Sequence, residues 1–216
     1  SIVIICEEDR IEKVISGVDR GVGLRILFDG RTIYGFTNQV TEDALFDLAG
    51  RLRHGVKEDR RGLTDFCSPF RSSHPSNRGS SFAIEKHPNG FSIGEKVSAV
   101  KRAIEVARGL DPHVRQVKVL YRDVSQKISI ANSEGTWTEG ERVGTVFSVQ
   151  VVSAKGDVVQ TGYEPVGGTM GFELFDLHLP EKVAEVAAKR SLLMLSARKA
   201  PMGRMTVVLS SEAGGT

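Results

Sequence analysis

The sequence has little of what would assign it to a special class of protein. Its two cysteines, Cys6 and Cys67, belong to no CxxC pair, which excludes a disulfide-stapled scaffold and a zinc ribbon. No apolar run approaches the roughly 20 residues of a membrane-spanning helix, and the start lacks the pattern of a signal peptide. A formal charge of +2 is too small to indicate nucleic acid or an anionic membrane as a partner. We therefore expect a cytoplasmic protein with reduced thiols and no membrane contact, for which nucleic acid is not the expected partner.

The sequence also lacks a recognisable catalytic motif. Its five histidines form no HExxH pattern, and the glycines of residues 17–24 match neither a dinucleotide-binding nor a phosphate-binding loop. Cys67 and His74 lie seven positions apart, but no carboxylate or oxyanion donor stands near them to complete a nucleophilic site. The residues themselves thus predict neither a catalytic residue nor a metal ligand in this chain.

What is present is the composition of a globular protein, with 40% hydrophobic and 26% charged residues. In the N-terminal quarter, Asp29-Gly30 between two apolar runs predicts a hairpin, because a type I′ turn needs positive φ at both central positions. Thr41 precedes two acids and an apolar stripe, which predicts a capped helix that ends near Gly55. The expected strands are residues 2–6, 11–15, 22–28 and 31–37.

Residues 56–91 differ from their surroundings. They contain three of the seven prolines, many serines and no hydrophobic period. Such a stretch is either a solvated, mobile insertion or a basic loop that contacts a phosphate or a partner. We expect the insertion.

Order returns after this loop. Ser92 and Glu95 form a capping-box pattern, and Gly109 followed by Pro112 marks the end of the helix. The segments "VRQVKVLYRD", "SQKISIANSEG", "ERVGTVFSVQVVSAKGD" and "VVQTGY" then predict four strands of an antiparallel meander. The apolar helix positions expected to be buried are Val97, Val100, Ile104 and Ala107.

A last helix is expected to begin at Pro180 and to reach about Ala197. Residues 205–209 are an apolar, β-branched run, which predicts a buried strand of the sheet. The fold class is therefore α+β: a mixed, largely antiparallel sheet with hairpins and a meander, packed against about three helices. The apolar positions expected to line the last helix are Val183, Val186, Ala187, Leu193 and Met194.

Two glycine-rich stretches are candidates for function. "YEPVGGTMGFELFD" (163–176) is either a peptide-binding edge or an irregular connection to the last helix. At the end of the chain, Gly214 and Gly215 predict a turn into a further element, where bare backbone passes close to a bound peptide or simply forms a tether. Trp137, the lone tryptophan, either anchors an interface or covers the end of a sheet. The candidate channel or turn residues are Glu164, Gly167, Gly168, Thr169, Gly214 and Gly215.

Five stretches in order resemble a known family. "DRGVGLRILFDGRTIYGFTN", "TEDALFDLA", "ISIANSEGTW", "QTGYEPVGGTMGFELFD" and "MTVVLSSEAGGT" are similar to the N-terminal half of the TldD branch of TldD/PmbA proteins. These proteins were first described as modulators of DNA gyrase and are understood as zinc metalloproteases. The resemblance implies that residues 1–200 are the N-terminal domain, with the loop at about 56–91, and that residues 201–216 begin a C-terminal metallopeptidase domain.

The resemblance also implies where the chemistry lies. In the family, "SSEAGGT" is followed by a helix with an HExxxH motif, whose two histidines and a later cysteine hold zinc while the Glu acts as general base. Histidines five apart stand roughly 140° from each other on an ideal helix, so such a helix must be distorted. The chain stops before this motif, so we expect no zinc and no catalytic residue in it.

Two functions are compatible with these residues and with the resemblance. The first is the N-terminal portion of a TldD-like zinc metallopeptidase that cleaves extended peptides in a TldD–TldE-type complex, this portion being inactive alone and supplying scaffold, channel wall and partner surface. The second is a non-catalytic binding module or TldE/PmbA-like subunit that contacts a peptide, gyrase or nucleic acid. The expected partner is a TldE/PmbA-like subunit or a second copy.

Overall fold

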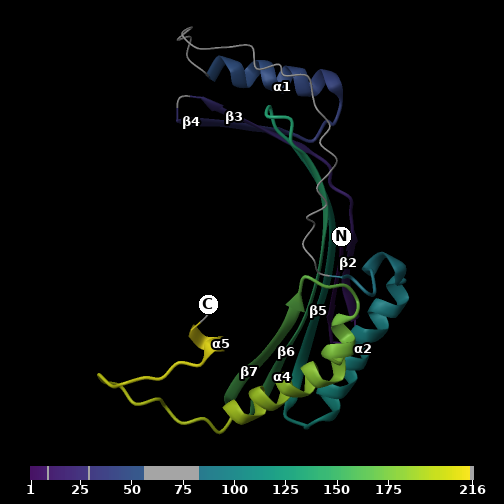
Figure 1. The fold of residues 1–216 in the computed structure, drawn as a ribbon. Coiled ribbons are helices and arrows are strands. Elements are labelled where there is room, and N and C mark those ends of the chain that lie inside the picture. Colours follow the sequence, from purple (N-terminus) through teal and green to yellow (C-terminus); the bar gives the residue numbers. More distant parts are fainter. Residues whose placement is uncertain (9, 29, 56–82, 215–216) are drawn as a thin grey trace.

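The computed structural model describes residues 1–8, 10–28, 30–55 and 83–214 of the chain. They form the predicted α+β fold, with an antiparallel five-stranded sheet, a separate two-stranded sheet and helices packed on both (Figure 1). Most of the predicted loop, Cys67 and His74 included, lies outside these residues. The elements are β1 (Ile2–Glu7), β2 (Arg10–Ser16), β3 (Val22–Phe28), β4 (Arg31–Thr37), α1 (Glu42–Gly55), the 3-10 turn η1 (Pro88–Gly90), α2 (Ile93–Gly109), β5 (Val114–Ala131), β6 (Trp137–Lys155), β7 (Val158–Gly168), α3 (Leu174–Leu177), α4 (Pro180–Met194) and α5 (Ser211–Gly214).

The larger sheet joins the first two strands of the chain to three strands from its second half. Its strand order is β2-β1-β5-β6-β7, and every neighbouring pair is antiparallel. β5, β6 and β7 form the predicted meander. β1 pairs onto the other side of β5, with Ile2 opposite Asp123 and Glu7 opposite Lys118. The first strands of the chain therefore belong to the same sheet as the meander.

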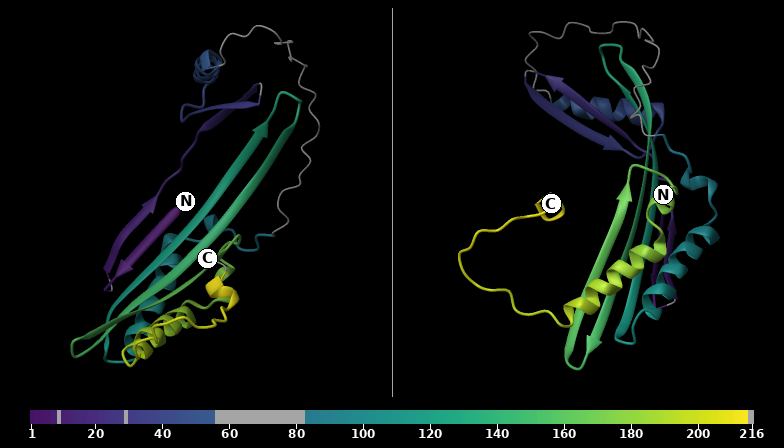
Figure 2. Two further views of the ribbon diagram at one scale, coloured as in Figure 1. Left: turned by 90° about the vertical axis from the view of Figure 1, so that its left-hand side faces the viewer. Right: turned by 60° about the horizontal axis from the view of Figure 1, so that its bottom comes forward.

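β5 corrects the prediction of two separate strands over 114–123 and 125–135. It is one strand of 18 residues, because no Gly or Pro interrupts it and its pairing with β6 continues to Ala131 opposite Trp137. β1 pairs with β5 only up to Asp123, and β7 pairs with β6 only from Thr145. Residues 124–131 and 137–144 thus form a two-stranded extension, here called the arm, which Figure 2 shows reaching beyond the rest of the sheet.

Helices α2 and α4 pack on one face of the five-stranded sheet. α2 has the predicted capping box: the Ser92 hydroxyl accepts from the backbone N–H of Glu95 at 3.2 Å, and the Glu95 carboxylate accepts from that of Ser92 at 2.7 Å. Beneath the helices lies the apolar core. Its fully buried strand residues include Ile4, Val117, Val119, Tyr121, Phe147, Val149 and Val151.

α4 begins at Pro180 as predicted, but its buried side is narrower and made of smaller residues than expected. Val183 and Ala187 are buried as predicted, whereas Leu193 is 70% exposed. The buried side is made of small residues because α4 packs closely on β7. A Cβ at Gly162 would lie 2.0 Å from the carbonyl oxygen of Ala187, so glycine is required at this crossing. Val186 and Met194, two further apolar positions expected to line this helix, are 37% and 43% exposed.

β3, β4 and α1 form a second unit, here called the head. β3 and β4 are the predicted hairpin, with Phe28 opposite Arg31; Asp29 itself lies outside the described residues. α1 packs on one face of this hairpin, where Leu48 is 4% exposed above Gly35. Figures 1 and 2 show the head at the far end of the arm, away from α2 and α4.

The prediction of a buried strand at residues 205–209 is wrong for this structure. No strand forms there, and the segment is exposed, with Val207 at 72% and Val208 at 95%. A strand needs a neighbour for its backbone hydrogen bonds, and no described strand lies beside this segment. A short helix, α5, follows, and its Ala213 N–H donates to the Ser210 hydroxyl at 3.4 Å.

Candidate functional site

The structure brings four of the six candidate residues together and separates the others from them. Glu164, Gly167 and Gly168 lie at the end of β7, an edge strand of the sheet, and Thr169 follows directly. Gly214 belongs to α5, which Figure 1 shows apart from the end of β7, and Gly215 lies outside the described residues. The end of β7 and the loop after it are therefore the candidate site.

Glu164 faces the helices rather than the open side of the sheet. Its carboxylate accepts from the guanidinium of Arg190 on α4, and Arg190 also donates to the backbone oxygen of Tyr163 at 2.8 Å. Glu164 thus ties β7 to α4. Its predicted role in a peptide channel stays a prediction.

The glycines at the end of β7 have a packing reason. Gly167 lies opposite Val146, and a Cβ on it would come within 2.9 Å of the backbone oxygen of Thr145. Gly168 lies opposite Thr145 and would bring a Cβ to 3.2 Å from Met170. These glycines leave the backbone of an edge strand bare, which is the feature that a bound extended chain would use.

The loop after β7 is fastened to the segment that precedes α2, in an arrangement here called the clasp. The Phe172 N–H donates to the Lys86 backbone oxygen at 2.7 Å, and the Lys86 N–H donates to the Glu173 carboxylate at 3.0 Å. The Lys86 ammonium contacts both carboxylate oxygens of Asp176, at 2.6 and 2.7 Å. The expected solvated insertion over 56–91 therefore does not hold for residues 86–91, whereas 56–82 lie outside the described residues.

Glu173 is the central residue of the clasp. It is 9% exposed, and its carboxylate also accepts from the Gly171 N–H at 2.8 Å. Burial raises the pKa of Glu173, but the backbone N–H groups, that of Gly171 first, outweigh burial and hold the pKa below its ordinary value. Gly171 is required here, because a Cβ would lie 2.2 Å from the Lys86 oxygen. The charged carboxylate thus fixes two backbone segments that are distant in sequence.

Aromatic rings join the clasp to the core. Phe91 stacks on Phe172 with ring centroids 4.2 Å apart, and Phe172 meets Phe175 edge-to-face at 5.0 Å. Phe175 in turn packs edge-to-face on Phe147 of β6 at 5.1 Å. The loop after β7 is therefore held by packing as well as by hydrogen bonds.

A buried ion pair lies under the same loop. The Lys96 ammonium of α2 donates to the Asp123 carboxylate at 2.7 Å, and their exposures are 0% and 2%. The Tyr121 hydroxyl donates to the same oxygen at 2.9 Å, and burial, followed by the Asp123 charge and this hydrogen bond, raises the pKa of Tyr121. Sequence reasoning missed this cluster, although Lys96 stands on the apolar stripe of α2, four positions before Val100.

The histidines take part in local contacts. His87 Nε2 lies 3.3 Å from the Glu141 carboxylate, which also accepts from the Ser125 hydroxyl at 2.8 Å. These two hydrogen bonds, that of Ser125 first, lower the pKa of Glu141. The order of contacts places the carboxylate between serine and histidine, so the histidine cannot take the serine proton as a nucleophilic triad requires. Within the described ranges, no three His, Cys, Asp or Glu side chains gather in a way that could hold a metal ion.

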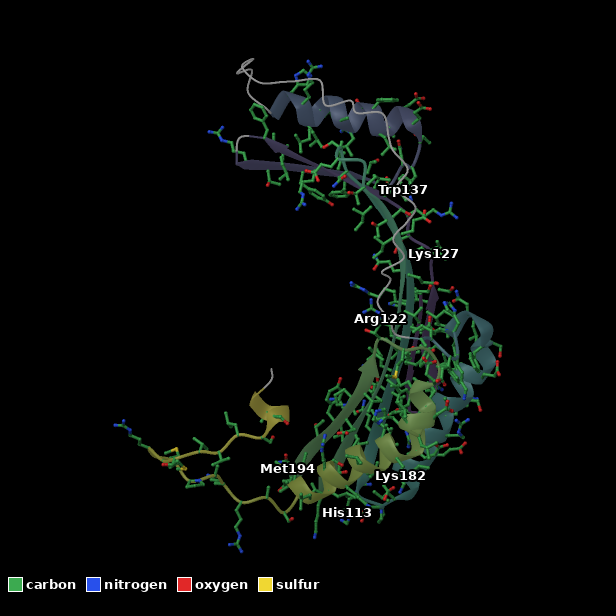
Figure 3. All side chains as sticks on the ribbon, viewed as in Figure 1. His113, Arg122, Lys127, Trp137, Lys182 and Met194 are labelled. Atoms are coloured by element: carbon green, nitrogen blue, oxygen red, sulfur yellow. The ribbon has the colours of Figure 1, made fainter. Side chains whose placement is uncertain are left out.

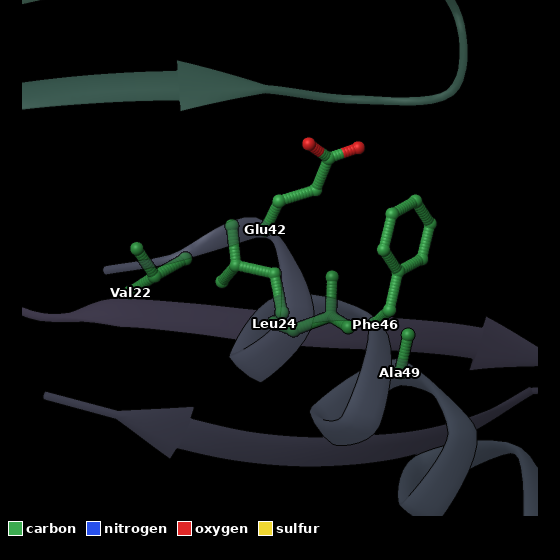
Figure 4. Close-up of a pocket in the computed structure, with 6 residues that line it drawn as sticks. Val22, Leu24, Glu42, Phe46 and Ala49 are labelled. Atoms are coloured by element: carbon green, nitrogen blue, oxygen red, sulfur yellow. The ribbon is translucent and has the colours of Figure 1, made fainter. Parts of the chain in front are cut away.

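The head carries an apolar groove of about 310 Å³ between β3 and α1, shown in Figure 4. Its lining is apolar except for Glu42, whose carboxylate stands on the open side of the groove, toward the arm. Phe46 at its rim is 69% exposed. Glu42 is the only ionisable side chain among the residues that line the groove. The lining residues are Val22, Leu24, Glu42, Leu45, Phe46 and Ala49.

Two family models match the chain. The model described as PmbA/TldA metallopeptidase domain 1 matches residues 1–55, and the model described as PmbA/TldA metallopeptidase central domain matches residues 86–195. Together they cover well over half of the chain. The stretch between them includes residues 56–82, which the structure does not describe.

Curated relatives match nearly all of the chain but are much longer. A metalloprotease of Methanothermobacter thermautotrophicus is 26% identical over 217 residues, which are 98% of this chain and 45% of the relative. A metalloprotease TldD homolog of Haemophilus influenzae is 24% identical over 212 residues, which are 96% of this chain and 43% of the relative. The chain thus spans less than half the length of these relatives.

Solved structures share the fold. A protein of Thermotoga maritima described as a modulator of a DNA gyrase has a TM-score of 0.72 at 16% identity, over 94% of this chain and 44% of that one. TldE of Thermococcus kodakarensis has a TM-score of 0.56 at 15% identity, over 88% of this chain and 41% of that one. At such identities the likeness concerns the fold alone.

Proposed function

The chain belongs to the PmbA/TldA metallopeptidase family, and from this premise we propose that it is the N-terminal part of a TldD-like zinc metallopeptidase. The whole protein would cleave extended peptides within a TldD–TldE-type complex. The observation that supports this most directly is the share of each sequence that takes part in the match. Relatives named metalloproteases match the chain almost from end to end, yet the chain spans less than half of each.

In this proposal zinc is bound by residues outside the chain. The described residues do not fit a metal centre, because they hold no cluster of His, Cys, Asp and Glu side chains. His54, His87, His113 and His178 come from four different places in the fold. In this proposal the activation of a water by zinc belongs to the part of the protein that follows residue 216, and the described side chains take no part in it.

This part would contribute scaffold, channel wall and partner surface. Among the candidate channel residues, Gly167 is the best placed, since it lies at the open edge of the sheet opposite Val146. Glu164 is held by Arg190 and would support the channel wall from behind. No described helix is long and apolar enough to cross a membrane. The cytoplasmic location expected from the sequence remains part of the proposal.

The reading frame beyond Thr216 tests the proposal. We expect an HExxxH motif within a few dozen codons and peptidase activity of the longer product on unstructured peptides. Replacing the motif's Glu by Gln should lower activity at least about 100-fold, the usual contribution of a general base. A frame without the motif would contradict the proposal and favour the second candidate, a non-catalytic subunit of the TldE/PmbA kind.

A further inference from the structure

The face of the five-stranded sheet opposite α2 and α4, here called the open face, is not covered by any described helix. Strand residues alternate between the two faces, so the register shows which side chains belong to it. One cross-strand row is Ile5, Leu120, Ser148 and Pro165. The next row is Val3, Arg122, Val146 and Gly167.

The centre of the open face carries several apolar side chains, although no described helix packs on it. Ile5 and Leu120 are half-buried by their neighbours alone, and Val146 is 42% exposed. An antiparallel sheet with one solvated face normally alternates apolar with polar residues. Here the open face carries an apolar patch around Arg122, made by Val3, Leu120 and Val146, and polar residues such as Lys118 and Gln150 lie beyond it.

Arg122 stands in the middle of this apolar surface. Its neighbours on the open face are Val3 and Val146 across the strands and Leu120 and Val124 along its own strand. Figure 3 shows its side chain leaving the sheet on the side away from the helices. In the part of the chain that the structure describes, no carboxylate or carbonyl oxygen pairs with its guanidinium.

No acid among the described residues is paired with Arg122. Glu7 lies on the open face two rows away from Arg122. Its carboxylate already contacts the Lys118 ammonium at 3.3 Å and accepts from the side-chain amide of Gln116. A second copy docked face to face would bring its own Arg122 onto the same patch, so like charges would meet without a free carboxylate. A carboxylate on whatever covers this face would satisfy the guanidinium most strongly.

The chain itself indicates where the cover comes from. After α4, residues 195–210 leave the helix and pass on the side of the open face (Figures 1 and 2). They carry apolar side chains with no described partner, including Met202 at 98% and Val208 at 95% exposure. The polypeptide thus heads toward the uncovered surface with hydrophobic residues still to bury.

We propose that the open face is a permanent interface with the polypeptide that follows residue 216 in the full-length protein, and that a carboxylate of that part pairs with Arg122. This inference rests on the proposed function, in which the chain is the first part of a longer peptidase. The interface buries Val146 and Leu120 and places Arg122 in a site with low solvent access.

Cysteine labelling tests the cover directly. Val146→Cys is made in a Cys67→Ser background, where Cys6 is fully buried, both in residues 1–216 and in the full-length protein. We expect the thiol to react at least about tenfold more slowly in the full-length protein, because labelling then requires local opening. Lys101→Cys, on the solvent side of α2, is the matched control and should react equally in both. Equal labelling of Val146→Cys in both proteins would overturn the proposal and leave the face as a solvated wall or transient site.

Charge reversal tests the ion pair. Arg122→Glu should lower the unfolding midpoint of the full-length protein by about 4 °C or more and leave that of residues 1–216 within about 1 °C. Lys101→Glu should change neither unfolding midpoint. Arg122→Lys keeps the positive charge, so it should lower the midpoint of the full-length protein less than Arg122→Glu does. If Arg122→Glu leaves the unfolding midpoint of the full-length protein unchanged, the proposed carboxylate partner is refuted. Zinc content and peptidase activity test the proposed function separately. A full-length protein in which Val146→Cys is protected from labelling, but which binds no zinc and cleaves no peptide, would refute that function and not the interface.

Discussion

The two faces of the five-stranded sheet are built by the same strands, yet the described helices cover only one of them. On β6, Val149 points toward the helices and is fully buried, whereas Val146 points the other way and is 42% exposed. Both are aliphatic, although the open face of β6 also carries Ser148 and Gln150, so the apolar residues of this face form a patch within a polar surface. The proposed interface accounts for this difference, because it supplies a cover for the open face that the described residues do not form. The predictions below separate what each face contributes.

The largest effect is expected on the covered face, at the buried ion pair. Lys96→Met leaves the Asp123 carboxylate buried and without its cation, which should lower the free energy of unfolding of residues 1–216 by about 3–5 kcal/mol. Urea unfolding measures it. The double variant Lys96→Met/Asp123→Leu removes both charges and should recover most of the loss. A single variant that costs less than about 1 kcal/mol would show that the pair does not hold α2 to β5.

The next effect concerns the contact between α4 and β7. Gly162→Ala places a Cβ 2.0 Å from the Ala187 oxygen and should cost about 2–3 kcal/mol through displacement of the helix. Gly140→Ala, on the arm, meets nothing within 4 Å and should stay within about 0.5 kcal/mol of the wild type. Equal stability of the two variants would mean that α4 does not press on β7.

A matched pair on one strand compares the faces directly. Val149→Ala should lower the free energy of unfolding by about 2 kcal/mol, because it leaves a cavity under α4. Val146→Ala in the same chain should cost less than about 1 kcal/mol, because this side chain is already partly in water. If the two cost the same in residues 1–216, the open face is packed in solution and the comparison fails.

The smallest effect is a pH dependence at the clasp. The pKa of Glu173 is lowered in the folded state, so its carboxylate stabilises the fold above the ordinary pKa of about 4.5, and this contribution disappears as the pH falls below it. Glu173→Gln should cost roughly 1 kcal/mol at pH 7 and lose less stability than the wild type between pH 5 and pH 3. Glu105→Gln, on the exposed side of α2, is the control. Parallel stability curves for wild type and Glu173→Gln would contradict the role of the charge.

Local signals predicted the local structure well. The capping box of Ser92 and Glu95, Pro180 at the start of α4 and the hairpin of β3 and β4 all depend on residues within a few positions of each other. The sheet order could not be predicted, since the pairing of β1 with β5 joins segments more than 100 residues apart. For residues 205–209 the local signal predicted a strand that does not form. Their β propensity is high, but a strand also needs a neighbouring strand for its backbone hydrogen bonds.

The candidate site was predictable only in part. Its glycines stood out in the sequence, because three of them occur within five residues, and the structure gives them packing reasons. The clasp did not stand out, since Lys86 and Glu173 are 87 positions apart and meet only in the fold. Arg122 was missed for a related reason, because its significance lies in its apolar neighbours on β1 and β6.

Zinc content tests the central claim most directly. Residues 1–216 and the full-length protein are purified side by side, dialysed against buffer with and without zinc, and measured for bound metal per chain. We predict no stoichiometric zinc on residues 1–216 and one zinc on the full-length protein, because the described residues hold no ligand cluster and the proposed function places the zinc ligands after residue 216. One tightly held zinc on residues 1–216, or none on the full-length protein, would contradict the account.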